Sequence, residues 1–352
     1  MAASTMKALV TAGDGSFRLQ DVSVPALSSG EILVKVIAAA QNPTDWKTLL
    51  LHTRPGNILG CDFAGTVVEI GPEVPTDLRK KGERVAGLVH GGITANGAFA
   101  EYVAVDAALV IPIPDNMTFE NAAQLGVACF TVCQSLYQCL GLPTPLQPTS
   151  VPEDILIWSG TSATGQYAVQ FAKLAGLRVI STASLKNIEF VKALGADEVF
   201  DYADSKTAKR ISAVTGGALK YAVDCISEGM TPNQVSMSLG EEGGTISTLL
   251  PYESRRLDAP VKTVFILGYS VFGKDVEFPF SFPANQEHYE NAKIYAKMIS
   301  EIISTGTVNP VPVHLYPQGL SSVQDGFEDM KAGKVHAEKI TYRISDTPGL
   351  GK

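Results

Sequence analysis

The stretch SGTSATGQ, residues 159–166, has the composition of a turn that holds phosphate groups. It follows the strand-like run DILIWS and opens a helix-like run, which is the context in which a GxGxxG turn binds a dinucleotide. The middle glycine of that pattern is replaced by Ser162, whose side chain must turn away if a pyrophosphate is to approach the backbone. The N-terminus of the helix that follows would supply N–H donors and partial positive charge. Candidate phosphate contacts are Thr161, Ser162, Ala163 and Thr164, although such a turn is also ordinary in α/β proteins.

The end of the next predicted strand, RVISTA, indicates which dinucleotide this turn would accept. An NAD site usually has Asp or Glu about 20 residues after the turn, where it binds a ribose hydroxyl. No acidic residue lies between Asp154 and Glu189, and the strand is followed by Ser184, Leu185, Lys186 and Asn187. Hydroxyl, ammonium and amide groups suit a 2′-phosphate, so the pattern favours NADPH, although Lys186 alone would also fit a solvated surface lysine. Tyr202, after EVFD, can also reach an adenosine phosphate, although a tyrosine there more often packs in a core.

Composition and charge limit the other function classes. Hydrophobic residues make up 45% of the 352-residue chain, and the net charge is −8 without a Lys/Arg block. Nucleic-acid or membrane-surface binding needs a basic footprint, so we expect neither. No apolar run approaches the roughly 20 residues that span a bilayer, and the run after Lys7 is too short for a signal peptide, so we expect a cytoplasmic protein. The five cysteines include no CxxC pair and the five histidines are scattered, so we expect no disulfide framework and no metal site.

The order of predicted elements indicates two domains. From Met6 to Pro114 the chain consists of β-rich runs separated by Gly, Pro or Asp, which predicts a β-barrel. A helix is expected over residues 118–140, with Thr118 as its N-cap. After a proline-rich stretch, strands alternate with helices, which predicts a parallel, doubly wound sheet. The last helices and the final strand fit the first domain better, so we predict an α/β protein in which the second domain is inserted into the first.

Several motifs in a fixed order resemble the medium-chain dehydrogenase/reductase superfamily over nearly the whole chain. They are NPTDWK, GCDFAGTVVEIG, AAQLGVACFTV, SGTSATGQYAVQFAK and KALGADEVFDY. The resemblance implies a GroES-like catalytic domain over residues 1–150 and 286–352, with a Rossmann NADPH-binding domain inserted over residues 151–285. Where zinc alcohol dehydrogenases carry metal ligands, this chain has Asn42 to Asp45 and Cys61-Asp62, so we expect a zinc-independent enzyme.

Within the superfamily, NPTDWK, TASLKN and the ending HAEKITYRI look most like the fungal trans-acting enoyl reductases of polyketide synthases, the type that includes the lovastatin enoyl reductase. This resemblance implies NADPH-dependent reduction of the C=C bond of an enoyl thioester or enone. Hydride would reach the β-carbon while hydrogen-bond donors stabilise the charge on the carbonyl oxygen. The resemblance makes Lys47, expected in a loop, and Thr131 the candidate catalytic residues. A loop lysine is otherwise usually a solvated charge, and a helical threonine often bonds to its own helix.

The resemblance also assigns residues to the coenzyme and to the acyl chain. Those near the nicotinamide end of the coenzyme are Thr44, Asp45, Trp46, Lys47, Leu249, Leu250, Glu338 and Lys339. Those expected to border the acyl chain are Val132, Cys133, Ser135, Leu136, Cys139, Tyr269 and Phe272. Without the resemblance, the apolar members of both sets would be interpreted as core residues.

The expected substrate is a small molecule or a carrier-bound acyl chain, with a polyketide synthase as a candidate partner. We expect a monomer, because Pro279 and Pro283 follow the last strand of the second domain and proline blunts an edge strand. Two alternatives stay open. A quinone reductase would use the same coenzyme and hydride step, and a non-catalytic NADPH-binding module would bind the coenzyme without turnover.

Overall fold

The computed structural model describes residues 4–51, 54–277 and 281–350. Within these ranges the chain forms two compact units: unit 1 comes from residues 1–130 and 269–352, and unit 2 from residues 131–268. The predicted domain boundaries at 150/151 and 285/286 lie elsewhere, because the prolines between residues 143 and 152 suggest a linker. Pro279, on which the expectation of a monomer partly rests, lies outside the described residues. No helix in the described ranges is both long enough and apolar enough to cross a bilayer.

Unit 2 is built on a six-stranded parallel sheet. Its strands are β8 Asp154–Trp158, β9 Arg178–Ala183, β10 Glu198–Asp201, β11 Tyr221–Asp224, β12 Gly244–Thr248 and β13 Val261–Phe265. They lie in the order β10-β9-β8-β11-β12-β13. This is the doubly wound order, in which the direction of strand addition reverses between β8 and β11, and ligands bind at the carboxyl ends of the strands at such a point.

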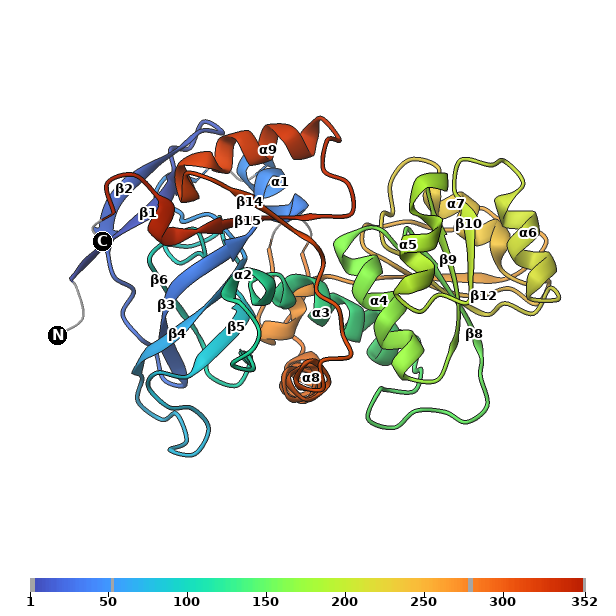
Figure 1. Ribbon diagram of the computed structural model, residues 1–352, viewed down its shortest axis with the longest axis horizontal. Coiled ribbons are helices and arrows are strands. Elements are labelled where there is room, and N and C mark those ends of the chain that lie inside the picture. Colours follow the sequence, from blue (N-terminus) through green and yellow to red (C-terminus); the bar gives the residue numbers. More distant parts are fainter. Residues whose placement is uncertain (1–3, 52–53, 278–280, 351–352) are drawn as a thin grey trace. The chain divides into compact units, whose positions relative to one another are not determined.

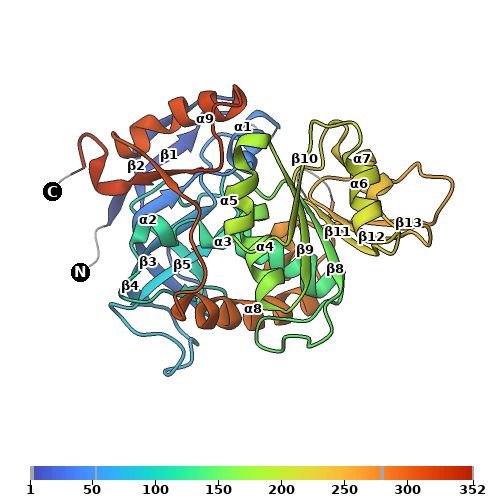
Figure 2. The same cartoon turned by 45° about the vertical axis from the view of Figure 1, so that its right-hand side comes forward.

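Helices cover both faces of this sheet. They are α4 Ala163–Leu174, α5 Ile188–Ala193, α6 Thr207–Val214 and α7 Thr231–Ser238. Figures 1 and 2 show α4 and α5 on one side of the sheet and α6 and α7 on the other. Because both faces are covered, the central strands are continuous apolar runs such as Ile155-Leu156-Ile157, in which all three residues are buried.

Unit 1 is a β-rich unit that both ends of the chain help to build. Its strands are β1 Thr5–Thr11, β2 Phe17–Ser23, β3 Glu31–Ala40, β4 Asp62–Ile70, β5 Arg84–Leu88, β6 Tyr102–Asp106, β7 Ile111–Pro112, β14 Val313–Tyr316 and β15 Lys339–Arg343. The main sheet has the order β14-β15-β3-β4-β5-β7, with β6 also paired to β3, and β1 pairs with β2 in a separate ribbon. Since β15 pairs with β3, the chain returns to its first sheet after completing unit 2, as an inserted domain requires.

The helical segments of unit 1 lie around this sheet. They are α1 Pro43–Leu51, α2 Phe119–Ala122, the start of α3 Leu125–Cys133, α8 Gln286–Ser304 and α9 Val323–Lys331, with short turns η3 Gly268–Phe272, η4 Gly319–Ser322 and η5 Ile344–Asp346. Phe63, Phe99, Phe327 and Tyr342 are fully buried and belong to one core cluster. This core holds β4, β15 and α9 in place. It thereby also positions Asp62 and Lys339, the first residues of β4 and β15.

The single helix expected over residues 118–140 is divided into three pieces. Thr118 caps α2 as predicted, because its hydroxyl accepts the N–H of Asn121 at 3.2 Å. The chain then breaks at Gln124, whose buried amide makes two hydrogen bonds of 2.9 Å with the backbone of Val311. After α3, residues Gln134–Cys139 (η1) form a π-helix, an uncommon form that often occurs at functional sites.

Candidate active site

The turn of residues 159–166 lies at the carboxyl end of β8, where strand order reverses. A Cβ atom on Gly160 would stand 2.4 Å from Ser181 Oγ, and one on Gly165 would stand 2.0 Å from the Ser159 carbonyl oxygen, so both positions need glycine. Ser162 has a φ of −67°, which any residue adopts. Its Oγ accepts the N–H of Gly165 and donates to the Ser159 carbonyl, both at 3.0 Å, so it caps α4. The predicted strand–turn–helix context is present, and contact with a coenzyme stays a prediction.

The end of β9 gathers the polar groups that were predicted for a 2′-phosphate. Residues Leu185–Asn187 form a 3-10 turn, and the amide of Asn187 donates to Ser184 Oγ at 3.2 Å. Leu185 and Lys186 are exposed. The backbone N–H of Tyr202 donates to the Ala183 carbonyl at 3.2 Å, which places the ends of β9 and β10 next to each other. Tyr202 is 48% exposed, so its side chain is available at the surface and does not serve as a core residue.

Two residues beside the reversal of strand order adopt a left-handed backbone. Ser159, after β8, has a φ of 67°, and Ser227, after β11, has a φ of 56°. Asp224 accepts the N–H of Ser227 at 2.9 Å, and the Ser227 hydroxyl accepts the N–H of Leu249 at 2.8 Å. Such conformations cost about 1–3 kcal/mol and concentrate at binding sites. The structure thus ties Leu249, a predicted coenzyme residue, to the end of β11.

Unit 1 contains a closed network of buried polar groups at the start of α1. Lys339 Nζ donates to Asn42 Oδ1 at 2.5 Å and lies 3.5 Å from Asp62 Oδ2. Asp62 also accepts the side-chain amide of Asn42 at 2.8 Å and the N–H of Val127 at 2.6 Å. Burial raises the pKa of Asp62, and the Lys339 ammonium is the largest effect that lowers it. The network joins β15, β4, α1 and α3, and it commits the Lys339 ammonium to groups of the protein itself.

Asp45 is a second buried carboxyl beside this network. Its Oδ2 accepts the N–H of Asn42 at 2.7 Å, which satisfies a donor that precedes the first turn of α1. Burial raises the pKa of Asp45 to about 7, and the Asn42 N–H and the Cys61 thiol act in the opposite direction. A carboxyl with this pKa exchanges its proton near neutral pH.

Tyr269 reaches the same region from η3. Its Oη lies 2.8 Å from Thr44 Oγ1 and 3.1 Å from Cys61 Sγ. Its ring stacks on His90, with centroids 3.6 Å apart and 17° between the ring planes. Burial raises the pKa of Tyr269 well above its usual value. The sequence prediction for Tyr269 is the acyl chain, and the structure brings it to Thr44, a residue predicted for the coenzyme.

Lys47 lies on α1 and not in the loop that the sequence analysis expects. Pro43 at the first helical position and Asp45 in the first turn both favour a helix start here. Lys47 Nζ lies 5.6 Å from the centroid of the Trp46 ring, and Lys331 Nζ lies 5.4 Å from the same centroid. Trp46 Nε1 is buried and has no hydrogen-bond partner among the described residues.

The other predicted catalytic residue, Thr131, is 6% exposed and lies near the end of α3. Four predicted acyl-chain residues follow it in α3 and η1, and each of them is buried: Val132, Cys133, Ser135 and Leu136. Ser135 Oγ is buried without a hydrogen-bond partner in the described part of the chain. Burial raises the pKa of Cys133, and it raises that of the half-buried Cys139 to about 11, so neither thiol is a ready nucleophile.

The remaining predicted residues do not join a polar cluster. Glu338 is exposed and pairs with His314 at 2.8 Å, so it does not enter the network of its neighbour Lys339. Phe272 and Leu250 are half-buried in η3 and after β12. The structure therefore brings together Thr44, Asp45, Tyr269 and Lys339 in unit 1. In unit 2, it brings together the strand-end groups of β9 and β10.

Comparisons with known proteins match both units. Residues 28–115 match the family described as Alcohol dehydrogenase GroES-like domain, and residues 163–275 match Zinc-binding dehydrogenase. The trans-enoyl reductase ACTTS2 of Alternaria alternata is 39% identical over 345 residues, which cover 97% of this chain and 99% of that protein. The chain belongs to the trans-enoyl reductase family. The trans-enoyl reductase buaC of Petromyces alliaceus is 36% identical and covers 97% of this chain and 98% of its own.

Membership of the trans-enoyl reductase family confirms the predicted superfamily, medium-chain dehydrogenase/reductase, and makes this protein a pyridine-nucleotide oxidoreductase. Solved structures share its fold at low identity. The CurK enoyl reductase has a TM-score of 0.76 at 19% identity and covers 97% of this chain and 99% of its own. A putative zinc-dependent alcohol dehydrogenase of Rhizobium etli CFN 42 has a TM-score of 0.78 at 21% identity, with 99% of both chains covered. These matches confirm the predicted α/β fold with its GroES-like and Rossmann-type domains.

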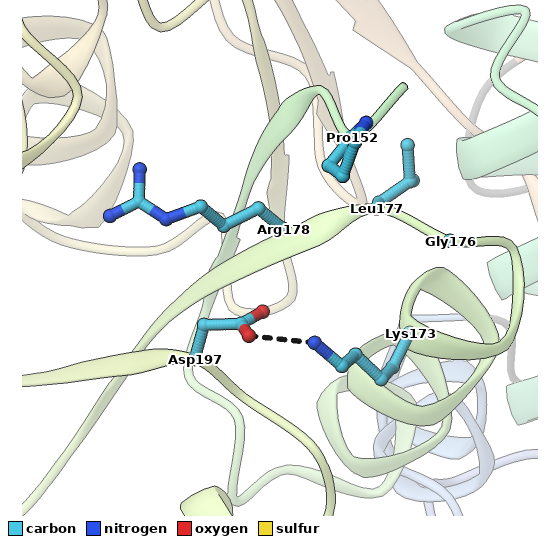
Figure 3. A pocket seen from close by; sticks show the side chains of 6 residues that line it. All are labelled: Pro152, Lys173, Gly176, Leu177, Arg178 and Asp197. Carbon is cyan, nitrogen blue, oxygen red and sulfur yellow. Dashed lines mark hydrogen bonds and ion pairs between the residues drawn. The ribbon is translucent and has the colours of Figure 1, made fainter. Parts of the chain in front are cut away.

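A small pocket of this reductase, drawn in Figure 3, lies away from the predicted coenzyme residues. It has a volume of about 220 Å³ and is lined by Pro152, Lys173, Gly176, Leu177, Arg178 and Asp197. Arg178 is the first residue of β9, and Lys173 pairs with Asp197 at 2.6 Å. The pocket is thus at the amino ends of the strands, whereas the glycine turn is at their carboxyl ends. None of its residues is a predicted site residue of the reductase.

Possible metal ligands bear on this reductase because one of its two family descriptions names zinc. In the described residues, His, Cys, Asp and Glu side chains form no group of three or more that could hold a metal ion. The description that matches residues 163–275 nevertheless names zinc. Zinc independence therefore stays a prediction, which rests on Asn42 and Cys61 standing where zinc enzymes carry ligands.

Sequence reasoning missed four members of the polar cluster in this reductase. Asn42, Cys61 and Asp62 had a signal, since Asn42 belongs to NPTDWK and Cys61-Asp62 to GCDFAGTVVEIG, but the sequence prediction uses all three only against a zinc site. His90 follows β5 and has no local signal. Only tertiary structure brings its ring onto Tyr269, 179 residues later in the numbering (269 − 90).

Proposed function

We propose that this protein reduces the C=C bond of an α,β-unsaturated carbonyl compound, either an enoyl thioester or an enone. One observation carries the reaction type: trans-enoyl reductases of two fungi match at 39% and 36% identity over nearly the full chain. Bound NADPH supplies the hydride. The side chains of the protein then have three tasks, which are to hold the coenzyme, to stabilise charge on the carbonyl oxygen and to provide a proton.

The proposal of NADPH over NADH rests on the groups at the end of β9. Ser184, Lys186 and Asn187 gather on one turn, in which Lys186 is exposed and the other two are half-buried, with Tyr202 at the adjoining strand end. The nearest acidic residue that follows, Glu189, pairs with Lys192 at 3.0 Å. Ammonium, hydroxyl and amide donors favour a phosphate dianion, and a carboxylate in their place would repel it. The glycine turn and the N-terminus of α4 are proposed to hold the pyrophosphate.

Lys47 and Thr131 are the proposed hydrogen-bond donors to the substrate and to the nicotinamide end of the coenzyme. A Thr131 hydroxyl in an otherwise apolar helix is suited to a carbonyl oxygen that gains negative charge. Lys47 is suited to orient the nicotinamide ribose or to help deliver the proton. We further propose Thr44, Asp45, Trp46, Leu249, Leu250, Glu338 and Lys339 near the nicotinamide end. For the acyl chain we propose Val132, Cys133, Ser135, Leu136, Cys139, Tyr269 and Phe272. For Asp45 and Lys339, their burial and protein partners support an indirect role through α1.

The deciding experiment follows NADPH and NADH oxidation against enals, enones, enoyl thioesters and a small quinone. The expected result is turnover of an enone or enoyl thioester with NADPH and much slower turnover with NADH. Preference for the quinone would favour the quinone-reductase alternative. Coenzyme binding without turnover of any acceptor would favour a non-catalytic module. Loss of turnover after treatment with a chelator would contradict zinc independence.

The chain offers a matched pair of lysines for testing Lys47. Lys47 and Lys331 lie at similar distances from the Trp46 ring, 5.6 and 5.4 Å from its centroid. If Lys47 only packs on the indole, Lys47→Ala and Lys331→Ala should have equally small effects on kcat. We expect Lys47→Ala to lower kcat by about 10²-fold and Lys331→Ala to leave it within about 2-fold of the parent.

The physiological substrate is proposed to be a carrier-bound acyl chain, presented by a polyketide synthase. Carrier-bound and free thioesters of the same acyl group can be compared by their KM values, and equal values would contradict a carrier contact. We also propose a monomer. A light-scattering mass close to 37.3 kDa is expected, and a mass near twice that value would overturn the proposal.

A further inference from the structure

Four side chains of unit 1 form a line of polar atoms whose ends are Asp45 and Thr44. Thr44 Oγ1 lies 2.8 Å from Tyr269 Oη, and either oxygen can be the donor. Tyr269 Oη lies 3.1 Å from Cys61 Sγ, and again either atom can be the donor. Hydrogen bonds that can reverse in this way allow a proton to pass between Cys61, Tyr269 and Thr44 without movement of these heavy atoms.

The packing around this line holds it in place. Cys61 and Asp45 are 0% and 1% exposed, and Tyr269 is 6% exposed. The stacked ring of His90, 3.6 Å from the Tyr269 ring, fixes the plane of the phenol. Thr44 is half-buried and is therefore the member of the line that is accessible to a ligand.

The Asp45 end of the line has an open hydrogen-bonding position. Oδ2 accepts the N–H of Asn42, whereas Oδ1 is buried and has no hydrogen-bond partner among the residues described. Asp45 and Cys61 act on each other. After burial and the Asn42 N–H, the thiol is the next influence on the pKa of Asp45. Burial, followed by the Asp45 carboxyl, raises the pKa of Cys61. No hydrogen bond of standard geometry joins the two side chains, so this step requires a small adjustment toward Oδ1.

We infer that Asp45, Cys61, Tyr269 and Thr44 form a proton relay that delivers the α-carbon proton of the reduction. This inference rests on the proposed function and deepens it by naming the proton source. Thr44 is the member that touches the reacting atoms, and the other three act through it. Asp45 is the store of the proton, since it is the carboxyl whose pKa, raised to about 7 by burial, lies near neutral pH.

The transfer balances as four coupled steps. The Thr44 O–H bond breaks as its proton binds the α-carbon of the substrate, which has received hydride at the β-carbon. Thr44 takes the proton of Tyr269, Tyr269 takes that of Cys61, and Cys61 takes that of the Asp45 carboxyl. Asp45 is left as a carboxylate, and a solvent proton entering along the same line in reverse restores it. The net uptake is one hydride from NADPH and one proton from water for each double bond reduced.

The relay predicts a pH dependence with a definite direction. Asp45 must be protonated at the start, so kcat is expected to fall as pH rises through about 7. The titratable and charged groups around Asp45 are Cys61 and Asp62 near β4, Lys339 on β15, Tyr269 on η3 and Tyr342 on β15. Asp45→Asn keeps an oxygen that accepts the N–H of Asn42 and removes the titrating group. This limb of the pH profile should therefore disappear in Asp45→Asn.

Two pairs of variants distinguish a relay from a structural role. Cys61→Ser and Thr44→Ser keep a transferable proton, whereas Cys61→Ala and Thr44→Val remove it. Thr44→Val does so at nearly unchanged volume, and Cys61→Ala leaves the space of one sulfur atom, for which comparison with Cys61→Ser controls only in part. Tyr269→Phe keeps the ring that stacks on His90. We expect kcat to fall by about 10²-fold in Cys61→Ala and Tyr269→Phe, and Cys61→Ser to recover at least about 10-fold of that loss. In Cys61→Ala the solvent deuterium isotope effect should rise, and the isotope effect of deuterated NADPH should shrink, because proton delivery becomes the slow step.

Equal kcat values and equal solvent isotope effects in Cys61→Ala and Cys61→Ser would overturn the relay while the proposed function stands. A parent enzyme without turnover would instead refute the proposed function. In that case infrared titration of the coenzyme-free protein still tests the relay. The band of a protonated carboxyl should titrate near pH 7, vanish in Asp45→Asn, and shift in Cys61→Ala but not in Cys61→Ser. A parent protein without such a band would overturn the inference, and so would a band that is unchanged by both substitutions of Cys61.

Discussion

Charged and polar groups are exposed at the strand ends of unit 2, whereas those at the start of α1 in unit 1 are buried. Around the end of β9, Lys186 is exposed and the segment from 155 to 188 contains no carboxylate. Around the start of α1, the side chains of Lys339 and Asp62 are 4% and 0% exposed and neutralise each other. An exposed donor keeps its hydration in the folded protein and is available to a ligand, whereas a buried charge must be compensated by another group of the chain. The exposed groups at the end of β9 are thus available to a ligand, as the proposed coenzyme contact requires, whereas the buried groups at the start of α1 must first compensate one another.

Removing one charge from the buried network should give the largest effect on stability. Lys339→Met leaves the Asp62 carboxylate buried without its cation, and we expect the free energy of unfolding of unit 1 to fall by about 3–5 kcal/mol in urea denaturation. Lys334→Met is the control, because Lys334 pairs with Asp329 at the surface and a surface pair contributes about 0–1 kcal/mol. Similar losses of stability in the two variants would show that the buried pair contributes no more than a surface pair.

A methyl group on the glycine turn should disturb both the fold and the coenzyme site of unit 2. In Gly165→Ala the new Cβ would meet the Ser159 carbonyl oxygen at 2.0 Å, so the turn must shift. We expect a loss of about 1–3 kcal/mol in stability together with weaker NADPH binding, measured by titration calorimetry. Gly216→Ala is a control in the same unit, because it adds a methyl group with nothing within 4 Å of the new Cβ and differs from Gly165→Ala in its positive φ of 60°. NADPH affinity that is unchanged in Gly165→Ala would argue against a phosphate site at this turn.

Removing the exposed lysine should affect binding and leave folding intact. We expect Lys186→Ala to weaken NADPH binding by about 10-fold, with NADH affinity and the urea midpoint unchanged, because a lost charge-assisted hydrogen bond to phosphate costs about 1.5 kcal/mol or more. Lys192→Ala is the matched control, since Lys192 pairs with Glu189 on the next helix. A stability loss in Lys186→Ala, or an equal loss of NADPH affinity in both variants, would show that the strand end is not a dedicated phosphate site.

The smallest effect is expected at the serine that replaces the middle glycine. Ser162→Ala removes the N-cap of α4 and should lower stability by about 1 kcal/mol, whereas Ser162→Gly should cost only a few tenths. Neither change should alter NADPH affinity much, since the backbone at this position already has an ordinary φ. Tighter NADPH binding by Ser162→Gly would contradict this expectation, because it would mean that the serine side chain limits the approach of the pyrophosphate.

The segments that the sequence predicts correctly are those whose structural signal lies in neighbouring residues. The glycine turn, the strand before it and the helix after it are adjacent in the chain, and the strand end with Lys186 lies about 20 residues further on. Thr118 as an N-cap is equally local and is confirmed by its hydrogen bond to Asn121. The break in the helix after α2 was missed, because it depends on Gln124 bonding to Val311, which is remote in sequence. The prediction of a loop at Lys47 is wrong, because Pro43 and Asp45 start the helix α1 directly after the preceding strand.

The sequence by itself determined the alternation of strands and helices, the family and the groups available for a phosphate, because each of these is written in neighbouring residues or in the order of motifs. Tertiary structure alone decided that Lys339 meets Asn42 and Asp62, and that Tyr269 joins Thr44 to Cys61. These contacts join residues more than 200 positions apart, through the pairing of β15 with β3 and the return of η3 to unit 1. The physical reason is that a buried polar group can be satisfied by any partner that the fold brings to it, and no local pattern encodes which one that will be.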